Sequence, residues 1–247
     1  MPVTRPYRRT CRQFVDGSYG RGDQPKYIRD ARFAEAPEHY IRAFLLLQQD
    51  LQRLFEYIEP ADRNLSTYSF RTHELLLRSC VEVEANCKAI LLENGYGRGS
   101  DLTMVDYKKL DATHRLSSYE VIAPVWYGAR GRRRPFENWR SGGSLPWYTA
   151  YNDTKHDRHS AFERATFEHV VDAMCGLVAV LAAQFYCHDF GPLTFLITSE
   201  RPADGSEVAI GDYFRVVFPT DWPTELRYEF AWQPLEGESD PFQQLAF

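Results

Sequence analysis

Three long segments of the chain carry apolar residues at every third or fourth position, and this periodicity predicts amphipathic helices. The first helix is expected over residues 37–58 and ends before Pro60. The second spans residues 67–93, and a third covers the strongly apolar stretch up to about residue 187. Because long helices joined by short polar loops usually pack antiparallel, the sequence predicts a helical bundle.

Two helix starts are expected around a polar stretch that precedes the third apolar segment. Ser144 and Pro146 open a helix that should run to about His156. Ser160, followed three residues later by Glu163, matches a capping box and predicts a second, independent helix start. The polar stretch should therefore lie at a helix–helix junction or at a kink in one long helix.

Strand patterns appear in two other parts of the chain. Residues 118–140 combine β-branched and aromatic residues with a tip rich in glycine and arginine, which predicts a β-hairpin. In the tail, apolar and polar residues alternate, as in a half-buried strand. The tail strands are expected at residues 194–198, 213–218 and 225–232.

These patterns divide the chain into three predicted parts. Residues 1–33 show no periodicity of apolar residues and are expected to form an irregular arm. Residues 34–190 form a helical bundle with the hairpin inserted, and residues 191–247 form a β-rich extension. The predicted fold is therefore mainly α: an antiparallel helical bundle with an inserted β-hairpin and a small C-terminal antiparallel β-sheet.

Charge and cysteine content narrow the classes of function. A formal net charge of −5 does not favour binding of nucleic acid over the whole surface of the protein. Any nucleic-acid site must therefore be a local basic patch. The five cysteines include no CxxC pair and lie largely in apolar helical patterns, which favours free thiols in the cytoplasm. The first residues lack the apolar core of a signal peptide. The apolar run at 173–183 is too short for a membrane span, so no membrane contact is expected.

The stretch YNDTKHDRH, residues 151–159, is the main candidate site. On a helix, Asn152 and His156 share a face, and Lys155 lies beside them. A histidine can transfer protons near neutral pH, while Lys155 and Arg158 can neutralise a phosphate. This set suits metal-independent cleavage of RNA through its own 2′-hydroxyl. The alternative is structural: helix capping together with a buried Asn–His hydrogen bond.

Two long helices followed by this motif resemble the HEPN superfamily of small prokaryotic helical bundles, many of which act in stress and phage defence. Its active members are metal-independent endoribonucleases with the motif Arg-Asn-x-x-x-His. The string PWYTAYNDTKHDR, residues 146–158, also resembles strings in other bacterial helical proteins. The resemblance covers roughly residues 37–187 and implies His156 as acid or base, Asn152 as a positioning group, and Lys155 and Arg158 as charge stabilisers. It also implies a homodimer.

The sequence departs from the family at one motif position. Tyr151 stands where the family has the arginine that stabilises the phosphate. This departure favours a second hypothesis, in which the chain is a non-catalytic interaction module that binds a partner protein through its C-terminal sheet.

A second basic feature lies in the predicted hairpin, in the string GARGRRRPFENWR. Arginines interleaved with aromatic residues can hold RNA phosphates and stack on bases. The alternative is a solvated hairpin tip in which charge blocks edge pairing. The candidate nucleic-acid contacts are Arg130, Arg132, Arg133, Arg134 and Arg140. No cofactor or metal is expected, because the paired histidines at 156 and 159 lack a third ligand in the pattern.

Overall fold

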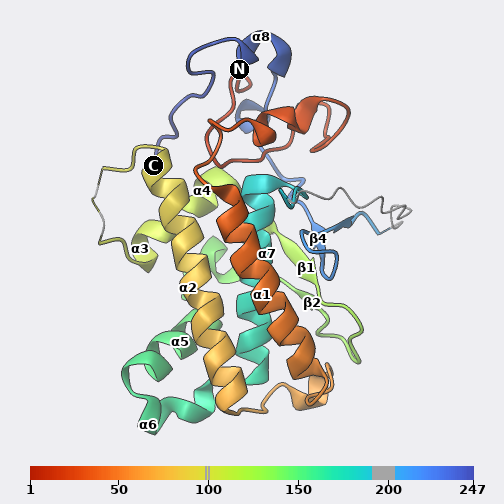
Figure 1. The fold of residues 1–247 in the computed structure, drawn as a ribbon, viewed down its shortest axis with the longest axis vertical. Helices are drawn as coiled ribbons and strands as arrows, with labels where there is room; N and C mark the ends of the chain where they lie inside the picture. The colour runs from red at the N-terminus through yellow and green to blue at the C-terminus, as the bar shows by residue number, and fades with distance from the viewer. Residues whose placement is uncertain (98, 100, 191–203) are drawn as a thin grey trace.

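A computed structural model describes residues 1–97, 99, 101–190 and 204–247, and it is mainly helical. Four helices form the body of the molecule (Figure 1). They are α1 Pro37–Phe55, α2 Phe70–Glu93, α5 Pro146–His156 and α7 Phe167–Phe185. α1 and α2 run antiparallel, as expected, and α7 packs against both. The predicted helical bundle is present, and two short helices, α3 Met104–Tyr107 and α4 Leu110–His114, follow α2 in the chain.

α7 is the central helix of the bundle. It is buried on nearly every side, from Phe167 to Phe185. By length and composition it could cross a membrane, but 83% of its most apolar window is buried inside the molecule. That burial is the environment of a core helix, and the helix packs on α2, on α5 and on the strands.

The start of α7 differs from the predicted capping box. Thr166 is the N-cap of α7, and its hydroxyl accepts a hydrogen bond from the His169 amide over 3.4 Å. The amide of Ser160 instead donates to Asp157, which caps the four-residue α6, Arg158–Ala161. The prediction from Ser160 and Glu163 was wrong because a separate short turn intervenes before the long helix begins.

The predicted hairpin and part of the tail form a single antiparallel sheet in the order β2-β1-β4-β3. Its strands are β1 Glu120–Ile122, β2 Arg132–Arg133, β3 Glu207–Val208 and β4 Arg215–Val217. The pairing of β1 with β2 confirms the hairpin, and β4 confirms a tail strand. Within residues 204–247 the tail forms no separate sheet, because β4 pairs directly with β1 of the hairpin. The expected strand at 194–198 lies outside the described residues.

The expected strand at 225–232 is a correction. Tyr228 makes only isolated bridges, to Val3 and Phe14 of the N-terminal segment, and the short helix α8, Trp232–Glu236, follows. The alternation of apolar residues therefore reflects packing against the irregular N-terminal segment. Because that segment offers no continuous row of backbone groups, no ladder of β-sheet hydrogen bonds forms.

The N-terminal segment is irregular except for the 3-10 helix Gln24–Arg29, yet it is built into the core. Arg9, Thr10 and Cys11 are fully buried. The Cys11 amide donates to the carbonyl of Ala183 in α7 over 2.8 Å. The residues predicted to form an irregular arm therefore share one core with the bundle and the tail.

The cysteines are free thiols in the structure, as the sequence predicts. Cys11, Cys80, Cys87 and Cys175 are buried and form no disulfide. Burial raises the pKa of each of these thiols, which keeps them protonated and inert.

His114 at the end of α4 predicts a pH-dependent stability. The ring is fully buried, and burial lowers its pKa to about 3, although a hydrogen bond to the Arg9 carbonyl opposes the shift. Below about pH 6.5 the His114 ring therefore binds a proton in the unfolded chain but not in the folded chain. Between about pH 6.5 and pH 3 this residue should lower stability by about 1.4 kcal/mol per pH unit.

Urea unfolding at a series of pH values measures this effect as the difference between the wild type and His114→Gln. The wild type should lose more stability than the variant as the pH falls below 6.5. His39→Gln, at an exposed position on α1, serves as the matched control. Parallel curves for the wild type and His114→Gln would contradict the assignment.

Candidate functional site at the α5–α6 junction

Glu84 of α2 holds α5 in place. The hydroxyl of Tyr148 donates to one Glu84 oxygen over 2.6 Å, and the hydroxyl of Tyr151 donates to the other over 3.5 Å. Lys155 Nζ in turn donates to the Tyr151 hydroxyl over 3.0 Å. Burial and the Glu84 hydrogen bond raise the pKa of Tyr148, and the hydrogen bond with Tyr151 raises that of Lys155. The four groups form a chain of bonds from the bundle to the end of α5.

The helix breaks directly after His156. Asp157 leaves the helical region with φ −137° and ψ 71°, and its carboxylate caps α6. The predicted junction is therefore present, and it lies at the end of the bundle where α2 begins (Figure 1). Because the chain turns here, the end of α5 projects its polar side chains outward.

The predicted catalytic residues are gathered on this junction. His156, Lys155 and Arg158 are exposed, and Asn152 is half-buried one turn before His156. Among the described residues, His156 makes no hydrogen bond with Asn152, so the buried bond of the structural alternative is not formed. Arg158 likewise makes no ion pair within the described part of the chain, whereas its neighbour Arg164 is paired with Asp153. The junction thus combines a solvent-accessible imidazole with an unneutralised guanidinium.

Tyr151 occupies the place of the motif arginine and cannot act on a substrate from there. Its side chain is 1% exposed and points into the bonds with Glu84 and Lys155. Sequence reasoning missed Glu84 because the bond joins α2 to α5 across 67 positions of the chain. No local pattern signals such a partner.

The hairpin arginines are held by carboxylates. Arg130 pairs with Glu168, Arg132 and Arg134 pair with Glu120, and Arg140 lies 3.9 Å from Asp221. Acidic partners thus offset the charge predicted to attract RNA. The carboxylates come from α7, from β1 and from the tail, so the pattern GARGRRRPFENWR does not reveal them. The role of these arginines as nucleic-acid contacts stays a prediction.

Arg133 points the other way from its neighbour Arg132, as alternation along β2 requires. It is 4% exposed, its Nη1 donates to Asp172 Oδ1 over 3.0 Å, and its guanidinium stacks over the Trp126 ring at 4.9 Å. Burial raises the pKa of Asp172, and the Arg133 charge counteracts this shift. Arg133 is thus an internal cation that joins the hairpin to α7.

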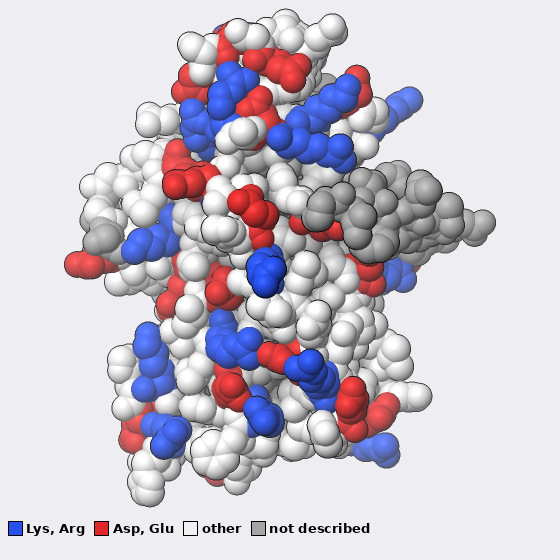
Figure 2. All heavy atoms as spheres, in the orientation of Figure 1, with Lys and Arg blue, Asp and Glu red and all other residues white. Residues whose placement is uncertain are grey.

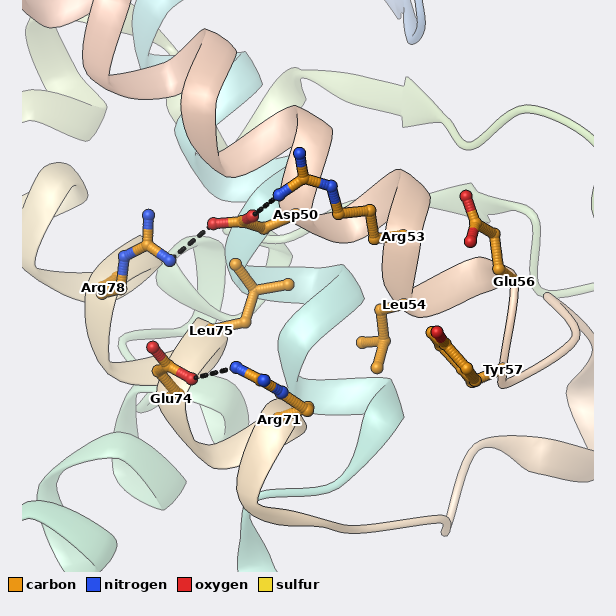
Figure 3. A pocket seen from close by; sticks show the side chains of 9 residues that line it. All are labelled: Asp50, Arg53, Leu54, Glu56, Tyr57, Arg71, Glu74, Leu75 and Arg78. Carbon is orange, nitrogen blue, oxygen red and sulfur yellow. Dashed lines mark hydrogen bonds and ion pairs between the residues drawn. The ribbon is translucent and has the colours of Figure 1, made fainter.

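A pocket of about 660 Å³ lies between the end of α1 and the start of α2. Figure 3 shows Leu54 and Leu75 on its floor and charged side chains on its walls. Arg53 and Arg78 both bond to Asp50, and Arg71 bonds to Glu74. Three arginines thus meet three acidic residues, Asp50, Glu56 and Glu74, and the pocket carries no net charge.

Within the described residues no group of three or more His, Cys, Asp or Glu side chains could hold a metal ion. At the α5–α6 junction, the exposed imidazole of His156 can transfer protons, and Lys155 and Arg158 can stabilise negative charge.

Comparisons with known proteins identify no relative. No family model matches the sequence. Searches of curated proteins and of solved structures likewise found no match.

The Glu84 bonds predict a stability effect at the base of the site. Glu84→Gln replaces the charged acceptor of the Tyr148 and Tyr151 hydroxyls by a neutral amide, which weakens both hydrogen bonds. The variant should therefore have a free energy of unfolding lower by about 1–2 kcal/mol. Urea denaturation measures the loss. Glu74→Gln on the same helix removes only an exposed pair with Arg71 and should change stability by less than about 0.5 kcal/mol. Equal losses in the two variants would refute the role of Glu84.

Proposed function

We propose that the chain is a HEPN-like, RNA-associated protein of the prokaryotic cytoplasm that acts in stress or defence and cleaves RNA without a metal at the α5–α6 junction. The observation that supports this most is the exposed His156 ring, which has no hydrogen bond in the described structure and stands beside Arg158. A histidine kept for structure is expected to be buried and bonded instead. The hydrogen-bonded Tyr148 and Tyr151 beneath it provide a rigid support.

The proposed reaction uses the RNA's own 2′-hydroxyl. His156 Nε2 or Nδ1 removes the proton from that hydroxyl, and the 2′-oxygen attacks the adjacent phosphorus. The bond from phosphorus to the 5′-oxygen breaks, leaving a 2′,3′-cyclic phosphate, and the departing oxygen takes up a proton. Arg158 and Lys155 stabilise the charge on the phosphate oxygens, and Asn152 orients the phosphate or the imidazole.

Charge on the surface restricts where RNA is expected to bind. Acidic and basic side chains alternate over the face formed by α1 and α2 (Figure 2). Contact with RNA should therefore be short and centred on the junction. In a homodimer, as the family resemblance implies, two copies of this junction would share one site.

The test is cleavage of a single-stranded RNA by the purified chain in the presence of a chelator. His156→Ala should reduce the rate on the order of 10²–10⁴-fold, because a positioned acid–base group contributes that much. It should leave the unfolding free energy within about 0.5 kcal/mol, because the ring is exposed and unbonded. His39→Ala, at an exposed position on α1, is the matched control and should cleave at the wild-type rate.

Two outcomes would overturn the proposal: a wild type that cuts no RNA, or a His156→Ala variant that cuts as fast as the wild type. The second candidate, a non-catalytic interaction module, would then be preferred. One observation favours it already: the buried Tyr151 stands where the family has its motif arginine. In that function the sheet of β1 to β4 would present the surface for a protein partner.

A further inference from the structure

The exposed aromatic side chains of the described residues all lie at one end of the bundle, where α1 ends and α2 begins (Figure 1). They are Tyr57, Tyr68, Phe70 and Tyr127. Tyr127 belongs to the hairpin, but its amide bonds to the Pro60 carbonyl in the loop between α1 and α2. Exposed large aliphatic residues lie mostly elsewhere, as Leu46, Val81 and Val105 do on α1, α2 and α3. This concentration of large rings in solvent indicates a binding surface.

Phe70 is the first residue of α2, and its position is fixed. Ser69 is the N-cap, and its capping box with Thr72 holds the first turn of the helix. Phe70 is 68% exposed, and its ring packs on Phe162 with 4.7 Å between the centroids. Phe162 also meets the Tyr68 ring edge-on, at 5.8 Å. Tyr68, Phe70 and Phe162 thus form a supported group of rings, the Phe70 platform, with most of Phe70 open to solvent.

The Phe70 platform lies beside the α5–α6 junction. Phe162 begins a 3-10 helix, Phe162–Arg164, which packs on both α5 and α6. An ion pair between Arg164 and Asp153 ties this 3-10 helix to α5. Because α6 is a single turn, only about 6 Å along its axis separates Arg158 from Phe162. The unpaired cation of the junction and the platform are therefore within the reach of neighbouring nucleotides of one strand.

The charged side chains around the platform are largely paired. Arg71, next to Phe70, pairs with Glu74, and Arg164 pairs with Asp153. Charge alone therefore offers a partner little attraction to the platform itself. Stacking on a ring does not need an excess of charge, and the flat face of a nucleobase matches an exposed aromatic ring.

We infer that the Phe70 platform is a stacking subsite for an unpaired base of single-stranded RNA, next to the phosphate held at the α5–α6 junction. The subsite accepts any base, because every base has a π-face, and it discriminates against a duplex, whose bases are already stacked and paired. A base held on Phe70 also favours the proposed reaction. In-line attack by the 2′-oxygen requires the nucleotides that flank the phosphate to be splayed apart. The inference rests on the proposed association with RNA, but it concerns binding and does not require cleavage.

The test is fluorescence anisotropy with a labelled single-stranded RNA whose 2′-oxygens are all methylated. Methylation removes the nucleophile, so the strand cannot be cut and binding is measured alone. The wild type should bind this strand more tightly than the same strand annealed to its complement. A strand with abasic positions keeps the phosphates but lacks the bases, and it should also bind more weakly.

Phe70→Leu isolates the stacking contribution, because leucine is apolar but has no flat ring. The variant should bind the methylated single strand roughly five- to 150-fold more weakly, which corresponds to about 1–3 kcal/mol for one stacked base. Phe70→Tyr keeps the ring and should bind as the wild type does. Phe247→Leu is the matched control, because Phe247 is a partly exposed ring that contacts Tyr96 at the other end of α2. It should leave the affinity unchanged.

Three results would overturn the inference: equal affinity of the wild type for the single strand and the duplex, a folded Phe70→Leu variant that binds as the wild type does, or no binding of any oligonucleotide. The last result would leave a protein partner as the occupant of the aromatic end. Failure of the ribonuclease proposal is distinguishable. A wild type that binds through Phe70 but cuts no unmethylated RNA refutes cleavage alone, whereas a wild type that cuts RNA while Phe70→Leu binds normally refutes the subsite alone.

Discussion

The buried guanidinium of Arg9 joins parts of the structure that lie far apart in the chain. Its Nε bonds to Glu93 at the end of α2 over 2.6 Å, and its Nη1 bonds to Gln184 in α7 over 3.0 Å. Its Nη2 bonds to the Glu35 carbonyl just before α1. A buried charge is tolerated only when it is paired and hydrogen-bonded, and here each nitrogen has an acceptor. Three helices are therefore fixed at one end by a residue outside any helix.

The packing of α5 on the bundle is organised by Glu84, which lies within α2. This carboxylate receives both tyrosine hydroxyls of α5, so the orientation of α5 about its axis is fixed from α2. The same orientation that buries Tyr151 leaves His156 in solvent one turn further on. The exposure that makes His156 a candidate acid or base is thus a consequence of an interaction made by its neighbours.

Arginines with similar sequence surroundings have different environments in this protein. Alternation along β2 places Arg132 at the surface and Arg133 inside, against α7. The exposed arginines of the hairpin meet carboxylates from distant segments, whereas Arg133 keeps one edge of its guanidinium free. A basic string therefore contains a charge-compensated surface and, next to it, a buried cation that is paired with Asp172.

The sequence determined the helices and the hairpin, because apolar periodicity and the residues at helix ends act within a few positions of the chain. The junction after His156 was also predictable, since Asp157 and Ser160 form a local cap. The partners of Tyr148, Arg9 and Arg133 were not. Their side-chain partners are carboxylates or amides brought close only by packing, from positions 39 to 175 residues away. Tertiary structure alone decided which charges are neutralised, because local patterns carry no information about distant partners.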